Sequence, residues 1–306
     1  MKETRLRVSH RRIKNSRADR LFYGANGIIM FLLFLVYAWP LWFVLIASFS
    51  NPDYVTTGQV LLLPKGFHLG GYELILEYQD ILRGYFNSIL YTVFGTALNL
   101  LMTICAAYPL SRRDFMPRRI LTVLFVFTMY FSGGLIPTFL QVKNLGLYDS
   151  PLAMIIPSAV SMYNVLILRS FFMYGIPKSL EEAAVLDGAN SLSFLTHIAI
   201  PLVKPTLAVL VLYYAVGHWN DYFNALIFLS SDKYMPLQTI LRDILIVGKI
   251  DMISSGMSME AVMEKMRVAQ TLKYSVIVVA TLPLMLVYPL IQKHFIKGIM
   301  LGAVKE

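Results

Sequence analysis

Long apolar segments alternate with short polar ones along most of this chain. An apolar stretch of about 18 or more residues is long enough to cross the hydrocarbon core of a bilayer as a helix. Six such stretches cover residues 27–49, 85–110, 120–140, 152–172, 200–229 and 271–292. Pro201 and Pro205 interrupt the fifth, so we expect its membrane part to begin near Thr206. The pattern predicts an all-α membrane protein with six transmembrane helices.

The polar segments between and around these stretches define the domain organisation. A basic segment, 1–26, precedes the membrane domain, 27–292, and a short tail, 293–306, follows it. Inside the membrane domain two polar stretches are long, namely the loop 173–200 and the loop 230–270. With six spans these two loops lie on opposite sides of the membrane, and no internal repeat or linker divides the chain.

Composition agrees with a membrane location, and charge sets the direction. The chain is 57% hydrophobic and 15% charged, whereas soluble domains carry about 25% charged residues. Its net charge of +9 is concentrated beside the spans, which argues against a nucleic-acid-binding face. The basic residues before the first span, after the second and after the sixth are Lys2, Arg5, Arg7, Arg11, Arg12, Lys14, Arg17, Arg20, Arg112, Arg113, Arg118, Arg119, Lys293, Lys297 and Lys305. The positive-inside rule then predicts that both termini are cytoplasmic.

The usual residues of catalysis and metal binding have no productive spacing in this sequence. There is no G-x-x-x-x-G-K-[ST] motif to hold the phosphates of ATP. The single cysteine, Cys105, lies in an apolar segment, and the five histidines have no metal-ligand spacing. We therefore expect a chain that is not itself an enzyme and that carries no metal or other cofactor.

The loop 173–200 has the pattern of two short helices rather than of a simple connection. Ser179 followed by Glu182 predicts a capping box with Ser179 as the N-cap residue. About two helical turns follow, and Gly188 can adopt the left-handed conformation that ends a helix. A second helix can begin at Asn190 or at the serine after it.

Two interpretations of this loop remain. In the first it is an ordinary capped surface helix, with Glu182 as a capping residue and Gly188 as a stop. In the second it is a docking helix, in which Ala183 and Ala184 let a partner protein approach closely and Glu182 offers a charge to the rim of that partner.

The spacing of the loop favours the docking interpretation. The pattern Glu-Ala-Ala, three residues, Gly, nine residues, Ile-x-(Leu/Ile)-Pro runs from Glu182 to Pro201, with Ile200 where leucine is usual. It resembles the signature loop of the permease subunits of ATP-binding-cassette importers of the carbohydrate type. The resemblance extends to the second permease of the maltose system and to the polysaccharide and oligosaccharide permeases of Gram-positive bacteria. Shorter matches support it along the chain: Asn87-Ser88, Gly133-Gly134-Leu135-Ile136-Pro137, Trp219-Asn220 and the residues 295–305.

This resemblance implies a type I importer permease fold with a cytoplasmic coupling-helix loop, in a bacterial cell membrane. The implied partners are a second homologous permease, two ATPase subunits that hold ATP and Mg, an extracytoplasmic solute-binding protein and an oligosaccharide substrate. In that family the loop helix sits in a cleft of the ATPase and the tail reaches toward the ATPase pair. The residues implied for docking are Glu182, Ala183, Ala184, Asp187, Gly188, Gly302 and Lys305.

Polar residues inside the fifth apolar segment are candidates for the substrate pathway. An ionisable group at mid-membrane costs at least ~3 kcal/mol on insertion scales, so such residues usually face a bundle interior or an aqueous path. Amides and carboxylates can bind sugar hydroxyls, and aromatic rings can stack on sugar faces. The alternative is hydrogen bonding between helices. The candidates, with two from the fourth segment, are Tyr163, Asn164, Trp219, Asn220, Asp221 and Asn224.

The loop 230–270 contains a methionine stripe at helical spacing, formed by Met259, Met263 and Met266. One interpretation is an amphipathic helix at the membrane surface. The other, implied by the family, is a contact for the solute-binding protein, because methionine surfaces adapt to partners.

Three other functions remain open to the sequence. The same architecture could carry peptides or inorganic anions, and the sugar itself could derive from pectin, alginate or starch. An ion-driven transporter working alone would need inverted repeats and midplane carboxylates, for which only Asp221 is available. A membrane scaffold without transport activity is the third.

The docking interpretation predicts the effect of reversing one charge. Glu182→Lys should leave membrane insertion intact and lower sugar-stimulated ATP hydrolysis, because the substitution lies on the exposed partner face. ATP hydrolysis by the purified complex, with and without sugar, measures this. Full coupled activity of the variant would contradict a docking role for Glu182.

Overall fold

The computed structural model describes residues 16–244, 269–287 and 289. The chain divides into two compact units, Met1–Phe67 and His68–Glu306, which we describe separately. Helices make up nearly all of the regular structure in the described part, and the one β-contact there is an isolated antiparallel bridge between Ser50 and Phe67.

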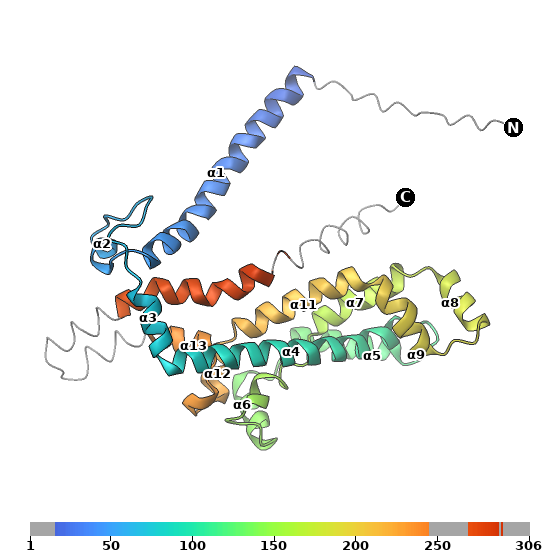
Figure 1. The fold of residues 1–306 in the computed structure, drawn as a ribbon. Coiled ribbons are helices and arrows are strands. Elements are labelled where there is room, and N and C mark those ends of the chain that lie inside the picture. The colour runs from blue at the N-terminus through green and yellow to red at the C-terminus, as the bar shows by residue number, and fades with distance from the viewer. Residues whose placement is uncertain (1–15, 245–268, 288, 290–306) are drawn as a thin grey trace. The chain divides into compact units, whose positions relative to one another are not determined.

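The first unit is dominated by one long apolar helix, α1 (Arg17–Ser48). Ser16 and Asp19 form a reciprocal capping box at its start, which satisfies backbone N–H groups that the helix leaves unpaired. At 1.5 Å per residue its 32 residues reach about 48 Å, more than a hydrocarbon core needs. Most of its side chains are exposed although they are apolar, as expected of a helix solvated by lipid. A short helix, α2 (Pro52–Thr56), follows it (Figure 1).

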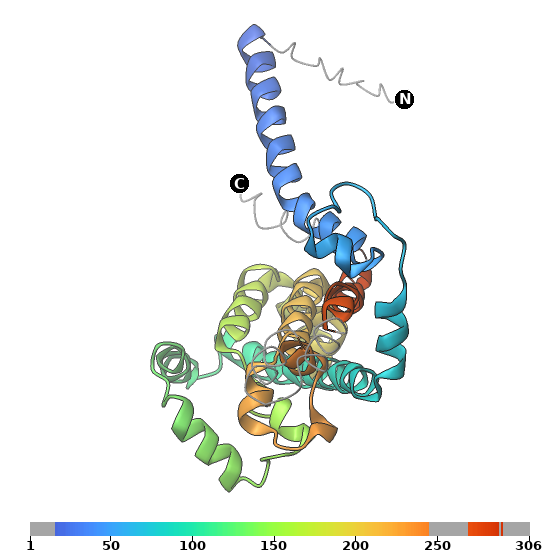
Figure 2. The same ribbon diagram turned by 90° about the vertical axis from the view of Figure 1, so that its left-hand side faces the viewer.

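The second unit is a bundle built around α4. Its helices are α3 (Gly70–Glu77), α4 (Gln79–Ser111), α5 (Arg118–Tyr130), α6 (Leu135–Asn144), η1 (Pro151–Met154), α7 (Met162–Tyr174), α8 (Lys178–Leu186), α9 (Ser191–Phe194), the π-helical turn η2 (Leu195–Ala199), α10 (Ile200–Leu202), α11 (Lys204–Trp219), α12 (Phe223–Phe228), η3 (Asp232–Tyr234), α13 (Leu237–Arg242) and the helix Ala269–Val287. The helix α4 packs against α7, α11 and α13, and Figures 1 and 2 show α11 and α7 lying along it.

A seam of small and polar residues on α4 makes this packing possible. Ser88 accepts a hydrogen bond at its hydroxyl from the backbone N–H of Leu237, at 2.9 Å. Thr103 shares one with the Tyr214 hydroxyl at 2.7 Å. The Asn99 side-chain oxygen lies 2.6 Å from Nε2 of His218. These bonds satisfy polar groups that lipid cannot, and they fix the register of α11 and α13 on α4.

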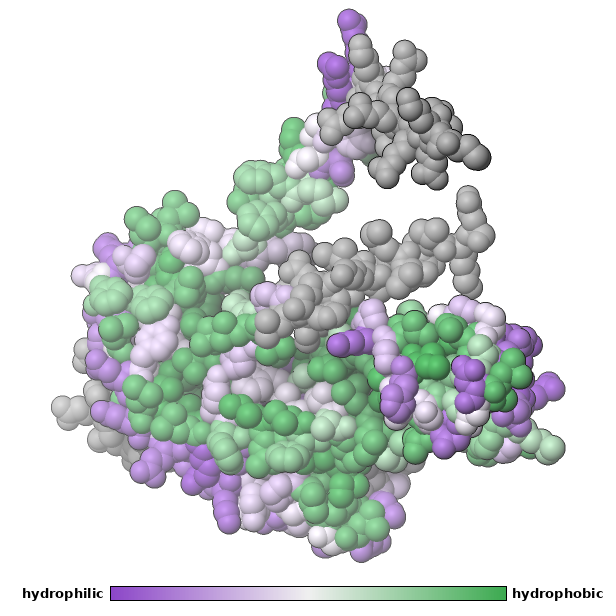
Figure 3. Space-filling view, turned by 45° about the vertical axis from the view of Figure 1, so that its right-hand side comes forward, coloured by the Kyte–Doolittle hydropathy of each residue, from purple (hydrophilic) through white to green (hydrophobic). Residues whose placement is uncertain are grey.

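Three helices are apolar and long enough to cross a membrane, or up to five when each of two bent pairs counts as one span. The three are Arg17–Ser48, Gln79–Ser111 and Ala269–Val287. They correspond to the predicted segments 27–49, 85–110 and 271–292, the last of which extends beyond the described residues. Hydrophobic side chains cover much of the face that Figure 3 presents, as a lipid-exposed surface requires.

The predicted segments 120–140 and 200–229 are not continuous helices. The first is split into α5 and α6, which meet at 115°, because the chain extends through Gly134 at a φ of 88°. The second is bent by 80° where α10 meets α11. It breaks again before α12, where Oδ1 of Asp221 accepts a bond from the backbone N–H of Asn224 at 3.2 Å. Such local side-chain bonds compete with helix continuation.

The prediction of a helix over 152–172 is wrong in its first half. The chain there forms the short turn η1 and then irregular backbone, and α7 begins only at Met162. Pro157 explains the difference, because proline lacks the backbone N–H and disfavours the helical conformation of the residue before it. Apolar composition alone could not distinguish this irregular segment from a helix.

One carboxylate ties two connecting segments of the bundle together. Asp149, just before η1, accepts bonds from the backbone N–H groups of Ser230 and Ser231 at 2.9 and 2.8 Å, and from the Ser231 hydroxyl at 2.5 Å. The Ser231 hydroxyl, followed by these two amides, holds the pKa of Asp149 below its usual range. The start of the loop 230–270 is therefore anchored.

The close approach of α4 to α11 gives a stability prediction. A Cβ at Gly95 would lie 2.4 Å from Nε2 of His218, whose bond to Asn99 leaves the ring little room to move. We expect Gly95→Ala to cost about 1–3 kcal/mol of overpacking, seen as a lower thermal midpoint of the detergent-solubilised protein. Gly217→Ala on α11 is the control, because nothing lies within 4 Å of that Cβ, and it should keep or raise the midpoint. Equal midpoints for the two variants would contradict this packing.

Candidate docking helix and substrate pathway

The helix α8 contains most of the residues predicted for docking. It begins at Lys178, with Pro177 in the N-cap position and no side-chain cap. The predicted capping box with Ser179 as N-cap is therefore wrong. Pro177 has an extended backbone and lies immediately before the helix, so Ser179 already belongs to the first turn.

The end of α8 follows the sequence prediction. Asp187 is the C-cap residue, and Gly188 adopts the left-handed conformation with a φ of 78°. After this turn, Oδ1 of Asn190 accepts a bond from the backbone N–H of Ser193 at 2.8 Å and caps α9. The two-helix pattern of the loop, the glycine turn and the position of the second helix are confirmed.

The exposed face of α8 differs from the one inferred from the sequence. Glu182, Ala183 and Asp187 are exposed, but Ala184 is only 6% exposed and packs into the largest core cluster. Leu186, at 88% exposure, is the apolar residue most open on the helix, and the sequence analysis did not single it out. Val185 beside it is 63% exposed, so α8 presents two neighbouring apolar side chains next to the charge of Glu182.

Several predicted residues lie outside the described part of the chain. They are Gly302 and Lys305 of the tail and Met259, Met263 and Met266 of the outer loop, and their assignments stay predictions.

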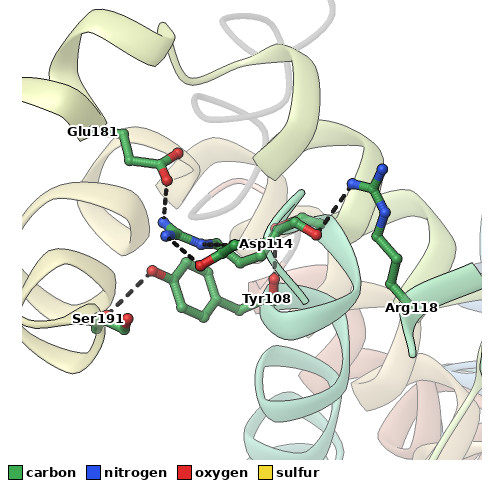
Figure 4. Close-up of polar contacts among 7 residues, drawn as sticks. Tyr108, Asp114, Arg118, Glu181 and Ser191 are labelled. Carbon is green, nitrogen blue, oxygen red and sulfur yellow. Dashed lines mark hydrogen bonds and ion pairs between the residues drawn. The ribbon is translucent and has the colours of Figure 1, made fainter. Parts of the chain in front are cut away.

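An ion-pair cluster lies beside α8, at the end of α4 (Figure 4). The Arg112 guanidinium contacts Glu181 of α8 at 2.5 Å and Asp114 at 3.1 Å. The hydrogen bond from Arg112 is the main reason that the pKa of Asp114 lies below its usual range. The cluster borders a cleft of about 420 Å³ that Glu182 also lines. The sequence analysis assigned Arg112 only a topological role, because its partner is distant in the chain.

A polar pocket of about 370 Å³ opens among the helices near Asn99, in the middle part of α4. It brings together three of the residues predicted for the pathway, Asn164, Asp221 and Asn224. The side-chain amide of Asn224 donates to Oδ2 of Asp221 at 2.7 Å, which orients both groups. The other lining residues are Asn99, Ser158, Ser161, Tyr213, Tyr214, Gly217 and His218.

The bond between His218 and Asn99 supports one wall of this pocket. Asn99 is fully buried, and its amide nitrogen donates to the backbone oxygen of Ser158 at 2.5 Å. Its oxygen is therefore left to accept from Nε2 of His218. The pocket is lined by amides, hydroxyls and one carboxylate, a set that can bind the hydroxyl groups of a polar ligand.

The other three predicted pathway residues do not line the pocket. Trp219 is 3% exposed, and its indole N–H donates to the backbone oxygen of Ala280 at 3.0 Å, so it packs in the core. Tyr163 is 60% exposed and lies outside the lining. The side-chain amide of Asn220 donates back to its own helix, to Val216, at 2.9 Å. Their contact with a substrate stays a prediction.

A multi-pass helical protein with a polar pocket among its helices and an exposed helix on a loop belongs to the class of membrane transport subunits. The chain belongs to the family described as the binding-protein-dependent transport system inner membrane component, whose model matches residues 12–301. The predicted importer permease resemblance is confirmed, as is the all-α permease fold.

Individual relatives match over nearly the full length. The chain is 44% identical to the polygalacturonan/rhamnogalacturonan transport system permease protein YtcP of Bacillus subtilis (strain 168), covering 96% of this chain and 100% of the relative. It is 38% identical to protein LplC of the same organism, over 95% of this chain and 97% of that protein. Among solved structures it matches a bacterial ABC transporter involved in the import of the acidic polysaccharide alginate, with a TM-score of 0.82, 33% identity, and 93% and 100% of the two chains covered.

The pocket geometry predicts a difference between two matched substitutions. Asn164→Leu places an apolar group in the pocket and should lower substrate uptake about tenfold, the effect of losing about 1.4 kcal/mol of binding to polar partners. Asn220→Leu is the control, because Asn220 lies outside the lining, and it should lower uptake far less. Uptake of labelled substrate by cells with equal amounts of each variant in the membrane measures this. A larger loss in Asn220→Leu would show that the pocket is not the pathway.

Proposed function

We propose that this chain is a permease subunit of an ATP-driven importer for oligosaccharides rich in uronic acids. The observation that carries the proposal is the full-length similarity to two transport proteins for acidic polysaccharides, at 44% identity for the polygalacturonan/rhamnogalacturonan permease and 33% for the alginate importer chain. The galacturonate units of the first two polymers and the uronate units of alginate each carry a carboxylate.

In this proposal the energy comes from a partner. The chain lacks the phosphate-binding motif of ATPases, so ATP and Mg would be held by two separate ATPase subunits, and this chain would need no cofactor. The exposed charge of Glu182 and the exposed apolar Leu186 of α8 are suited to docking of this helix in a groove on such a subunit. The basic flanks favour a cytoplasmic position for this loop and for both termini.

The remaining partners complete the transport path. A second, homologous permease would supply the other half of the translocation path, and an extracytoplasmic solute-binding protein would deliver the sugar. Docking helices that follow ATPase closure would rock the spans as rigid bodies and expose the polar pocket to each side in turn. The amides and hydroxyls of the pocket would bind sugar hydroxyls without a need for metal or covalent chemistry.

Reconstitution of the whole assembly tests the proposal. The chain is purified with its co-expressed permease, ATPase and binding protein and placed in proteoliposomes. Binding protein loaded with a short oligogalacturonate should stimulate ATP hydrolysis about tenfold, within the usual range of coupling between sites. A neutral maltooligosaccharide of equal length should stimulate it much less.

The outcomes separate the parts of the proposal. Stimulation by the neutral sugar alone would contradict the acidic substrate and keep the importer. A purified chain that brings down neither an ATPase nor a second permease, under conditions that preserve related assemblies, would contradict the importer itself.

A further inference from the structure

The docking helix is fastened to the far end of the same helix that forms the pocket wall. Arg112 is the C-cap residue of α4, and its guanidinium reaches Glu181 in the first turns of α8. Along the chain these two residues are separated by the helices α5, α6, η1 and α7. The contact is therefore a tertiary link between α4 and α8.

The Arg112 guanidinium binds two carboxylates at once, those of Asp114 and Glu181. Its Nε and Nη2 donate to the two oxygens of Asp114, at 3.1 and 3.2 Å, and Nη1 meets Glu181. The Arg112 side chain is only 17% exposed, so water competes weakly for it. Asp114 orients the fork and leaves the remaining edge for Glu181, an arrangement that a lysine ammonium cannot reproduce.

A second link joins α4 to the helix on the other side of the Gly188 turn. The Tyr108 hydroxyl donates to the backbone oxygen of Ser191, the first residue of α9, at 3.2 Å. Its ring packs edge-on against Phe172 at 5.7 Å. Figure 4 shows Tyr108, Glu181 and Ser191 around the end of α4. Both short helices of the loop are thus attached within one turn of α4.

The helix α4 also reaches the polar pocket. Asn99 lies on α4 thirteen residues before Arg112, about 20 Å along a helix axis. The helix is continuous from Gln79 to Ser111, and Asn99 holds His218 of α11 through a buried bond. Pro109 lies between Asn99 and Arg112 and lacks a backbone N–H, but the helix runs through it to Ser111. A displacement of α8 that pulls the end of α4 would therefore reach the pocket through this one helix.

We propose that Arg112 is a positioning residue that, with Tyr108, transmits the movement of α8 to α4 and so couples ATP hydrolysis to transport. The proposal rests on the proposed importer function. A merely structural role would change the stability of the loop or the retention of the ATPase. The coupling role changes the number of ATP molecules hydrolysed per sugar imported.

A double-mutant cycle in the reconstituted assembly tests this link. We expect Arg112→Gln and Glu181→Gln each to raise the ATP hydrolysed per sugar imported about fivefold or more, the lower end of typical coupling between sites. The two together should be no worse than either alone, because residues that act through one contact are not additive. Arg113→Gln is the matched control, since Arg113 is exposed and makes no ion pair within the described residues, and it should leave the ratio unchanged.

A milder variant, together with measurements of ATPase retention and thermal stability, separates coupling from a structural role. Tyr108→Phe keeps the ring packing and removes the hydroxyl, with its bond to Ser191 and its polar interaction with Arg112, so it should raise the ratio without lowering the thermal midpoint. An unchanged ratio of ATP hydrolysed to sugar imported in these variants would overturn the coupling role. A raised ratio that is accompanied by loss of the ATPase subunit or by a lower thermal midpoint would overturn it too. Additive effects of Arg112→Gln and Glu181→Gln would also overturn it. A wild-type assembly that no sugar stimulates would instead contradict the proposed function.

Discussion

The need to pair polar groups away from water governs this structure. In a bilayer an unpaired amide or hydroxyl costs several kcal/mol, which favours a partner within the protein for each such group on a spanning helix. The helix α4 supplies such partners along one seam, where Ser88 pairs with α13 and Asn99 and Thr103 pair with α11. The buried hydroxyls of Thr92 and Thr96 on the same helix find no partner among the described residues. Because Gly95 lies against the His218 ring, the helices come close enough for these bonds to form.

The same helix gives the candidate sites a common frame. At its middle Asn99 forms part of the polar pocket, and at its end Arg112 holds Glu181 of α8. The pocket and the α8 region are thereby joined by one helix, whose ladder of backbone hydrogen bonds lacks a single donor at Pro109. A transport subunit needs such a connection, because energy supplied at one surface must change access at another.

Local sequence chemistry made part of the fold and of the candidate docking loop predictable. A long apolar run with a lipid-compatible surface is enough to place α1 and α4. A glycine between two short helical patterns is enough to place the turn at Gly188, since few other residues adopt its left-handed backbone. The helix start at Lys178 was missed by two residues, because Ser179 was taken as the N-cap residue while Pro177 holds that position. The stretch before α7 was misread because apolar content does not report whether backbone hydrogen bonds can form around Pro157.

The sequence by itself determined the class of the protein, the approximate positions of its long apolar helices and the existence of a two-helix loop between the fourth and fifth apolar segments. These features depend on the solubility of each segment in lipid or water and on short-range backbone preferences. Only the tertiary structure decided that Ala184 faces inward and Leu186 outward, that Trp219 packs in the core, and that Arg112 pairs with Glu181. Those outcomes depend on which helices meet, and a hydrogen bond or ion pair between distant segments leaves no periodic trace in either one.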